Sequence, residues 1–182
     1  MEQGSEHHAG AILVLLFAAC VSLRGLLFGA VSFINPDSAV FLKPDFLVVS
    51  QRLPFFPVLV NTLSLLGVDR FLAGKIVNAV CGSAAVFPLY TIVRQAGGSR
   101  RAGLFSGLLY ALSPLPFSNQ VLALSEGTFV LFMLVAIDGF FRLVNTGRWV
   151  SFFELLIGSG LAALTRAEGY ALVPIALLGG YV

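Results

Sequence analysis

The chain has 182 residues, of which 58% are hydrophobic and 11% charged, and its mean hydropathy is +0.94. This composition excludes a soluble globular domain, because such domains carry about 25% charged residues. The formal net charge of +2 at pH 7 is small, and the basic residues are spread between apolar stretches, so no nucleic-acid partner is expected. Cys20 and Cys81 lie inside apolar stretches and belong to no metal-binding spacing. We therefore expect an integral membrane protein.

Apolar stretches recur along the whole chain and predict one membrane domain, because a helix of about 20 apolar residues crosses a bilayer. The proline-bearing stretch 54–68 is short for a crossing and predicts an amphipathic helix lying in the interface. The apolar end, LLGGYV, indicates that the chain is the N-terminal part of a longer domain. The expected fold is an all-α, multi-pass helical bundle of about six spans, at 11–33, 71–93, 102–113, 127–144, 149–165 and 170–182.

Two local signals mark the segment between the third and fourth spans. Pro114 and Pro116 in the string SPLPF predict a helix break followed by a short loop that contains Asn119. Ser125 then precedes Glu126 in LALSEGTF, where we expect Ser125 to cap the fourth helix.

The basic residues indicate how the bundle is oriented. The turns 94–101 and 142–148 are the richest in Lys and Arg, so the positive-inside rule places both in the cytoplasm. The loop after the first span, the SPLPF loop and the turn TRAEG must then lie outside, provided that 54–68 does not cross the membrane. The acids and the arginine at these outer positions are Asp37, Glu126, Arg166 and Glu168.

Two acids are candidates for chemistry. Asp37, in INPDSAVFL, either forms the turn after Asn35 and Pro36 or serves as a general base or a ligand of a divalent cation. Glu126 either suits the dipole at the start of its helix or faces Asp37 as a second carboxylate. A carboxylate pair favours a hard cation, so the cofactor that the sequence suggests is Mg²⁺ or Mn²⁺ shared by Asp37 and Glu126.

The basic candidates would hold an anionic substrate group. Arg166 and Glu168 either form a plain surface pair or place a guanidinium, supported by Glu168, where it can clamp a phosphate. Arg52 and Lys75 are further candidates for phosphate binding, although each side chain could instead extend to the interface. Asp138 and Arg142 are spaced i, i+4 and should pair without a chemical role.

The order of these features resembles the integral-membrane glycosyltransferases of the GT-C class, which use polyprenyl-phosphate sugars. The nearest groups are the protein O-mannosyltransferases, the lipid A aminoarabinose transferases and related bacterial sugar transferases. The strings that carry the resemblance are INPDSAVFL, RLPFFPVLV, the pair Ser125-Glu126, and LTRAEG. The chain departs from the family in having Ser38 where many members have a second acid, and in lacking the usual histidine before Pro54.

The resemblance implies a catalytic role for Asp37 and a transfer of sugar from a polyprenyl-phosphate donor to a hydroxyl acceptor on a lipid, glycan or protein. It also implies reaction on the extracytoplasmic face of a membrane, here expected to be the bacterial inner membrane. One alternative is a multi-pass transporter or flippase, which would need ionisable groups near the membrane midplane, and only Arg24 comes near that depth. Another alternative is a non-catalytic membrane scaffold.

Overall fold

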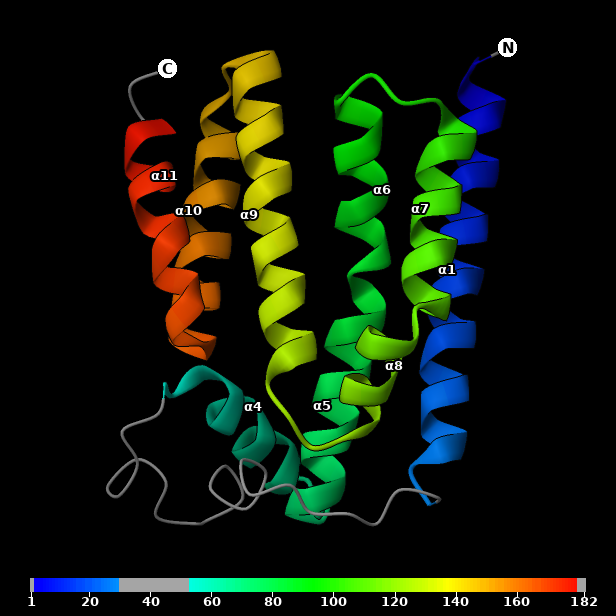
Figure 1. Cartoon of the computed structure of the whole chain (residues 1–182), viewed down its shortest axis with the longest axis vertical. Helices are drawn as coiled ribbons and strands as arrows, with labels where there is room; N and C mark the ends of the chain where they lie inside the picture. Colours follow the sequence, from blue (N-terminus) through cyan, green and yellow to red (C-terminus); the bar gives the residue numbers. More distant parts are fainter. Residues whose placement is uncertain (1, 30–52, 180–182) are drawn as a thin grey trace.

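A computed structural model of the chain describes residues 2–29 and 53–179. Every regular element in these two segments is helical, which confirms the predicted all-α bundle (Figure 1). Of the described helices, His8–Leu27, Arg70–Gln95 and Glu126–Thr146 are long and apolar enough to cross a membrane. The elements are α1 (Glu2–Leu27), α4 (Phe55–Ser64), α5 (Arg70–Ala84), α6 (Val86–Gln95), α7 (Arg100–Leu112), α8 (Pro114–Val121), α9 (Glu126–Thr146), α10 (Trp149–Thr165), the 3₁₀-helix η1 (Ala167–Ala171) and α11 (Leu172–Gly179).

The bundle separates its charged turns between two ends. Figure 1 shows the α6–α7 and α9–α10 connections at one end, and the α8–α9 and α10–α11 connections at the other. We call the first the basic end, because it holds the turns 94–101 and 142–148, and the second the site end, because it holds Glu126 and Arg166. The sorting of charges in the sequence thus corresponds to two opposite ends of the molecule.

The stretch 71–93, predicted as one span, is occupied by two helices in line. Pro88 lies in the first turn of α6 and has no N–H to donate to the carbonyl group of Ala84. The ladder is interrupted there, and Ala85 separates α5 from α6. The two helices continue in nearly the same direction (Figure 1), so together they have the length of one membrane-spanning segment.

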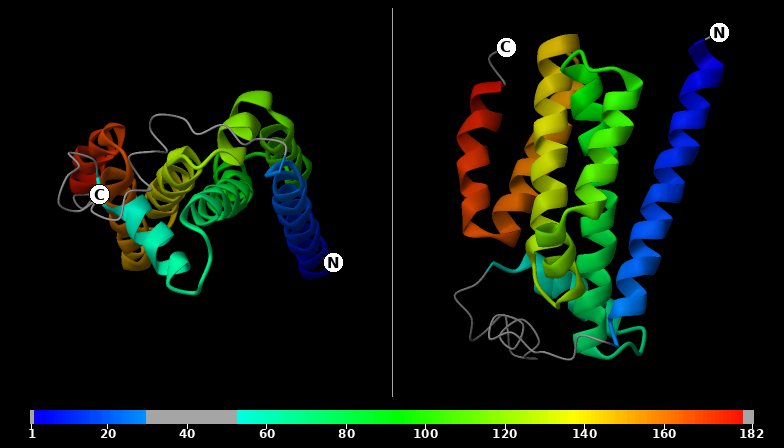
Figure 2. Two further views of the ribbon diagram at one scale, coloured as in Figure 1. Left: turned by 90° about the horizontal axis from the view of Figure 1, so that it is seen from below. Right: turned by 45° about the vertical axis from the view of Figure 1, so that its right-hand side comes forward.

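The short helix α4 lies across the site end of the bundle (Figures 1 and 2). Its 10 residues extend about 15 Å, half the thickness of a bilayer core, so it is too short to cross. Phe56 and Val60 are buried against Ala73 of α5, and the Phe55 ring meets that of Phe132 in α9, with centroids 5.3 Å apart. Because α4 packs on α5, α9 and α10, it covers the end where the site lies.

The prediction of a short loop after Pro114 was wrong, because Pro114 begins the helix α8 and Asn119 lies within that helix. A proline at the first helical position has a fixed φ suited to a helix, and its missing N–H would have had no intrahelical partner. Ser113 before it is extended, as residues before proline tend to be. Pro114 therefore ends α7 and starts α8 in a single step.

At the basic end, the predicted pair of Asp138 and Arg142 is confirmed, with Arg142 Nη2 and Asp138 Oδ2 2.9 Å apart. Arg142 Nε also lies 3.8 Å from an oxygen of Glu154 in α10, and Gln95 of α6 donates to Asp138. These contacts tie α6, α9 and α10 together at the end opposite Glu126.

Small residues bring α9 and α10 into direct backbone contact. A Cβ atom on Gly139 would lie 2.5 Å from the backbone nitrogen of Leu155, and one on Gly158 would lie 2.6 Å from that of Ala136. Close approach through glycine is a common way for membrane helices to pack. Because Glu126 begins α9 and Arg166 directly follows α10, this contact also determines how these two residues meet.

Replacing Gly158 with Ala should destabilise the bundle, because the added methyl group would overlap the backbone of α9. We expect the free energy of unfolding to fall by about 1 to 3 kcal/mol, as for other overpacked helix contacts. Thermal unfolding in detergent, followed by circular dichroism, measures the effect. Gly160→Ala in the same helix is the matched control, because no described residue lies within 4 Å of its added Cβ, and it should leave stability unchanged or raise it. Equal midpoints for the two variants would contradict the packing described here.

Candidate functional site

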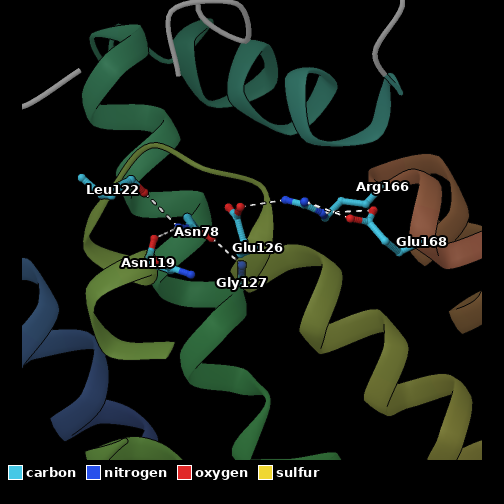
Figure 3. A network of polar contacts seen from close by, with 7 residues as sticks. All are labelled: Asn78, Asn119, Leu122, Glu126, Gly127, Arg166 and Glu168. Atoms are coloured by element: carbon cyan, nitrogen blue, oxygen red, sulfur yellow. Dashed lines mark hydrogen bonds and ion pairs between the residues drawn. The ribbon is translucent and has the colours of Figure 1, made fainter. Parts of the chain in front are cut away.

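Two predicted site residues from distant parts of the chain meet at the site end (Figure 3). Arg166 Nη1 donates to Glu126 Oε1 over 2.7 Å, although 40 positions separate the two residues. Their side chains are 31% and 28% exposed, respectively. The pair is thus partly shielded from water, and its hydrogen bond is charge-assisted, a kind that is stronger than a bond between neutral groups.

Glu168 holds the other edge of the same guanidinium group. Arg166 Nη2 lies 3.1 Å from Glu168 Oε1, and Arg166 Nε lies 3.3 Å from Glu168 Oε2, which makes a two-point contact. These hydrogen bonds hold the pKa of Glu168 below its ordinary value and are the main cause that raises the pKa of Arg166. The contact is therefore complete above the ordinary pKa of Glu and is lost as the pH falls through the lowered pKa of Glu168.

The second carboxylate oxygen of Glu126 is the atom of the site that could bind a ligand. Glu126 Oε2 is buried and has no hydrogen-bond partner within the described part of the chain, whereas Oε1 is engaged by Arg166. A buried carboxylate oxygen without a partner carries a desolvation penalty of about 1 to 3 kcal/mol. The atom can thus accept a hydrogen bond from a substrate hydroxyl group or bind a cation with a net gain.

The start of α9 is held by a residue that the sequence analysis missed. Ser125 was expected to cap the helix, but its side chain makes no capping hydrogen bond. Instead, Asn78 in α5 accepts a hydrogen bond from the backbone N–H of Gly127 over 2.7 Å. The Asn78 amide also donates to the carbonyl oxygens of Asn119 and Leu122, over 2.7 and 2.9 Å (Figure 3). A polar amide within an apolar span was the signal that could have revealed it.

The helix start and α5 approach each other so closely that only glycine fits between them. A Cβ atom on Gly127 would lie 2.4 Å from the backbone oxygen of Asn78 and 2.5 Å from its side-chain oxygen. The contact between Gly127 and α5 therefore also fixes the position of the backbone of Glu126, the preceding residue, relative to α5.

The remaining candidates are placed differently or lie beyond the described residues. Lys75 Nζ donates to the carbonyl oxygen of Phe28 over 2.8 Å and lies 4.5 Å from the centre of the Phe71 ring, next to the end of α1. Arg24 is fully buried and donates to the carbonyl oxygen of Cys20 in its own helix. Asp37 and Arg52 lie outside the described residues. The phosphate-binding roles of Lys75 and Arg52 stay predictions.

The described residues contain no group of three or more His, Cys, Asp and Glu side chains that could hold a metal ion. Glu126 could contribute one oxygen to a cation, because its other oxygen is engaged by Arg166. A site for Mg²⁺ or Mn²⁺ would need Asp37 as a second ligand, so the shared-cation role stays a prediction.

Comparison with protein-family models gives a match. A family model described as dolichyl-phosphate-mannose-protein mannosyltransferase matches residues 51–182. The matched segment includes Asn78, Glu126, Arg166 and Glu168, whereas Asp37 precedes it. No curated protein and no solved structure matches the chain.

Proposed function

The chain belongs to the dolichyl-phosphate-mannose-protein mannosyltransferase family, and we propose that Glu126 and Arg166 form part of its transfer site. Membership makes the protein a membrane glycosyltransferase that takes its sugar from a polyprenyl-phosphate donor. The finer proposal is that the acceptor is a hydroxyl group on a lipid, glycan or protein, and that transfer occurs on the extracytoplasmic side of a bacterial inner membrane.

The observation that carries the proposal is the guanidinium group of Arg166 fixed between two carboxylates. Glu126 and Glu168 engage three of its five N–H groups, and among the described residues the other two have no partner and could bind another anion. A planar guanidinium matches the geometry of phosphate oxygens, and its orientation is already set before a ligand arrives. Arg166 would hold the donor phosphate at the membrane surface, while the polyprenyl chain lies among the helices.

The acids would complete the reaction. Asp37 would remove the proton from the attacking hydroxyl group, or would share a divalent cation with Glu126. The unpartnered Oε2 of Glu126 supports either arrangement, because it can accept a hydrogen bond from the acceptor hydroxyl or bind the cation. Arg52 and Lys75 would add positive charge near the donor phosphate.

Purified protein in liposomes, supplied with polyprenyl-phosphate-linked mannose and membrane extract as the source of acceptor, tests the donor class. We expect labelled sugar to leave the polyprenyl donor and to appear on an acceptor fraction, whereas a nucleotide-linked sugar should give no transfer. Transfer from the nucleotide sugar alone would contradict the proposal.

A second arm of this experiment tests the side of the membrane. With Cys20 and Cys81 replaced by Ser, one new cysteine is placed at Ala167 of the site end or at Ser99 of the basic end, both exposed positions. In intact cells, an impermeant thiol reagent should label the Ala167→Cys protein and spare the Ser99→Cys protein. The opposite pattern would place the site end in the cytoplasm.

A further inference from the structure

Asn78 joins α5 to the segment that leads into Glu126, and no role follows for it from the family match. Its side chain is fully buried and makes three hydrogen bonds, all to backbone groups between Asn119 and Gly127. We propose that Asn78 is a positioning residue for sugar transfer, which sets the place of the Glu126 carboxylate. This inference rests on the proposed role of Glu126 in transfer.

The hydrogen-bonding groups of the Asn78 side chain match the backbone groups that face it from residues 119–127. Two of its partners are carbonyl oxygens, which need donors, and the third is an N–H group, which needs an acceptor. An amide provides both in one side chain, a hydroxyl group has a single donor, and a carboxylate has none. The longer Gln would need space that the close approach of Gly127 to Asn78 denies.

The position of these bonds couples Asn78 to Glu126. The N–H of Gly127 belongs to the peptide group that joins Glu126 to Gly127, so the bond from Asn78 holds the backbone of Glu126 directly. The bond to Leu122 ties the other end of the short connection between α8 and α9. With Ser125 making no capping bond, the start of α9 depends on Asn78.

A loosened Glu126 should affect the rate more than the binding of the donor. A displacement of about 1 Å at a reacting group can cost about 100-fold in rate. Donor binding should change less, because Asn78 is fully buried and because Arg166, the proposed phosphate ligand, keeps its two-point contact with Glu168. The expected signature is therefore a fall in kcat with little change in KM.

The test compares Asn78→Ala with Asn145→Ala in the full-length protein, with polyprenyl-phosphate-linked mannose as donor. Asn145 serves as a control far from the site, because its exposed amide donates to the carbonyl oxygen of Gln95 over 3.3 Å at the basic end. We expect Asn78→Ala to lower kcat by at least about 10-fold, with KM changed by less than about threefold, and Asn145→Ala to leave both unchanged. An unchanged kcat per folded Asn78→Ala molecule, with only a lower unfolding temperature, would overturn the inference.

Asn78→Asp gives a readout that a purely structural role would not produce, and it remains informative if Asn78→Ala fails to fold. The introduced carboxyl group still accepts from Gly127, and it can donate to one carbonyl oxygen only while protonated. We expect kcat to fall as the pH rises through its pKa, a dependence absent from the parent protein. A pH profile parallel to that of the parent would overturn the inference. Glu126→Gln, measured alongside, separates the two hypotheses, because full activity in that variant would refute the role of Glu126 itself.

Discussion

Replacing Arg166 with Ala is expected to lower kcat/KM for the polyprenyl-phosphate donor by about 30-fold to several thousand-fold. Removing one member of a hydrogen-bonded charge pair that is partly shielded from water costs about 2 to 5 kcal/mol when it also contacts the substrate, and each 1.36 kcal/mol is a factor of ten. The loss has two sources, because the donor phosphate loses its clamp and Glu126 loses the partner that lies 2.7 Å from its Oε1. Steady-state transfer by the purified variant measures the effect.

Arg166→Lys should recover little of this activity. An ammonium group is a compact point charge, and it cannot bond two carboxylates and a phosphate through one planar fork. Glu168→Gln is the companion variant: its side chain is 62% exposed, so its contact with Arg166 is weak and the loss should stay within about fivefold. Full activity of Arg166→Lys would show that the planar guanidinium is not needed for transfer. A large loss of activity in Glu168→Gln would show that Glu168 is as important as Glu126 for holding Arg166.

Hydropathy was sufficient to predict an all-helical membrane bundle, because backbone groups in lipid must bond within their own segment and only helices do so in a chain of this pattern. It could not locate the finer breaks. Pro88 splits one apolar stretch into α5 and α6, and Pro114 starts a helix where a loop was expected. Both prolines lie in the first turn of a helix, but the helix before Pro88 continues in nearly the same direction and the one before Pro114 does not (Figure 1), and the local sequence alone does not distinguish these cases.

The charged part of the site could be predicted because charges near hydrocarbon are costly and therefore conspicuous. The sequence placed Glu126, Arg166 and Glu168 on one side of the membrane, and the structure adds that Arg166 contacts both acids. Asn78 escaped notice because a neutral amide in an apolar span does not reveal from sequence which backbone groups it will meet. Its three partners come from α8, from the following turn and from α9, and only the folded bundle brings them together.

The two ends of the molecule use charge differently. At the basic end, both oxygens of Asp138 are engaged, one by Arg142 and one by Gln95, as expected of a structural tie between helices. At the site end, Glu126 keeps one buried oxygen without a partner among the described residues. An unsatisfied buried acceptor lowers stability, and such groups occur where a ligand completes them. Gln95 Oε1 at the basic end is also buried without a partner among the described residues, so what sets the site end apart is that its unpartnered oxygen belongs to a carboxylate.

The same open oxygen bears on which acid removes the proton from the acceptor. The family resemblance implies a catalytic role for Asp37, so we propose Asp37 as the base, and Glu126, held by Arg166, would orient the acceptor hydroxyl group. Changing Asp37 to Asn removes the basic oxygen while keeping the size of the side chain. We expect kcat to fall by about 10² to 10⁴-fold, the usual contribution of general acid–base catalysis. Transfer by the variant, with its folding checked by circular dichroism, measures this directly, and unaltered turnover in a folded variant would remove Asp37 from the mechanism.

A chelator distinguishes the two roles that Asp37 can have. If Asp37 and Glu126 share a divalent cation, EDTA should abolish transfer by the parent protein, and Mg²⁺ or Mn²⁺ should restore it. Glu126→Gln should then raise the cation concentration needed for half-maximal activity, because an amide oxygen is a weaker ligand than a carboxylate. If transfer is indifferent to EDTA, Asp37 acts as the base alone, and Glu126 retains the task of holding Arg166 and the acceptor hydroxyl. The response of Glu126→Gln to added cation thus decides what its unpartnered oxygen binds.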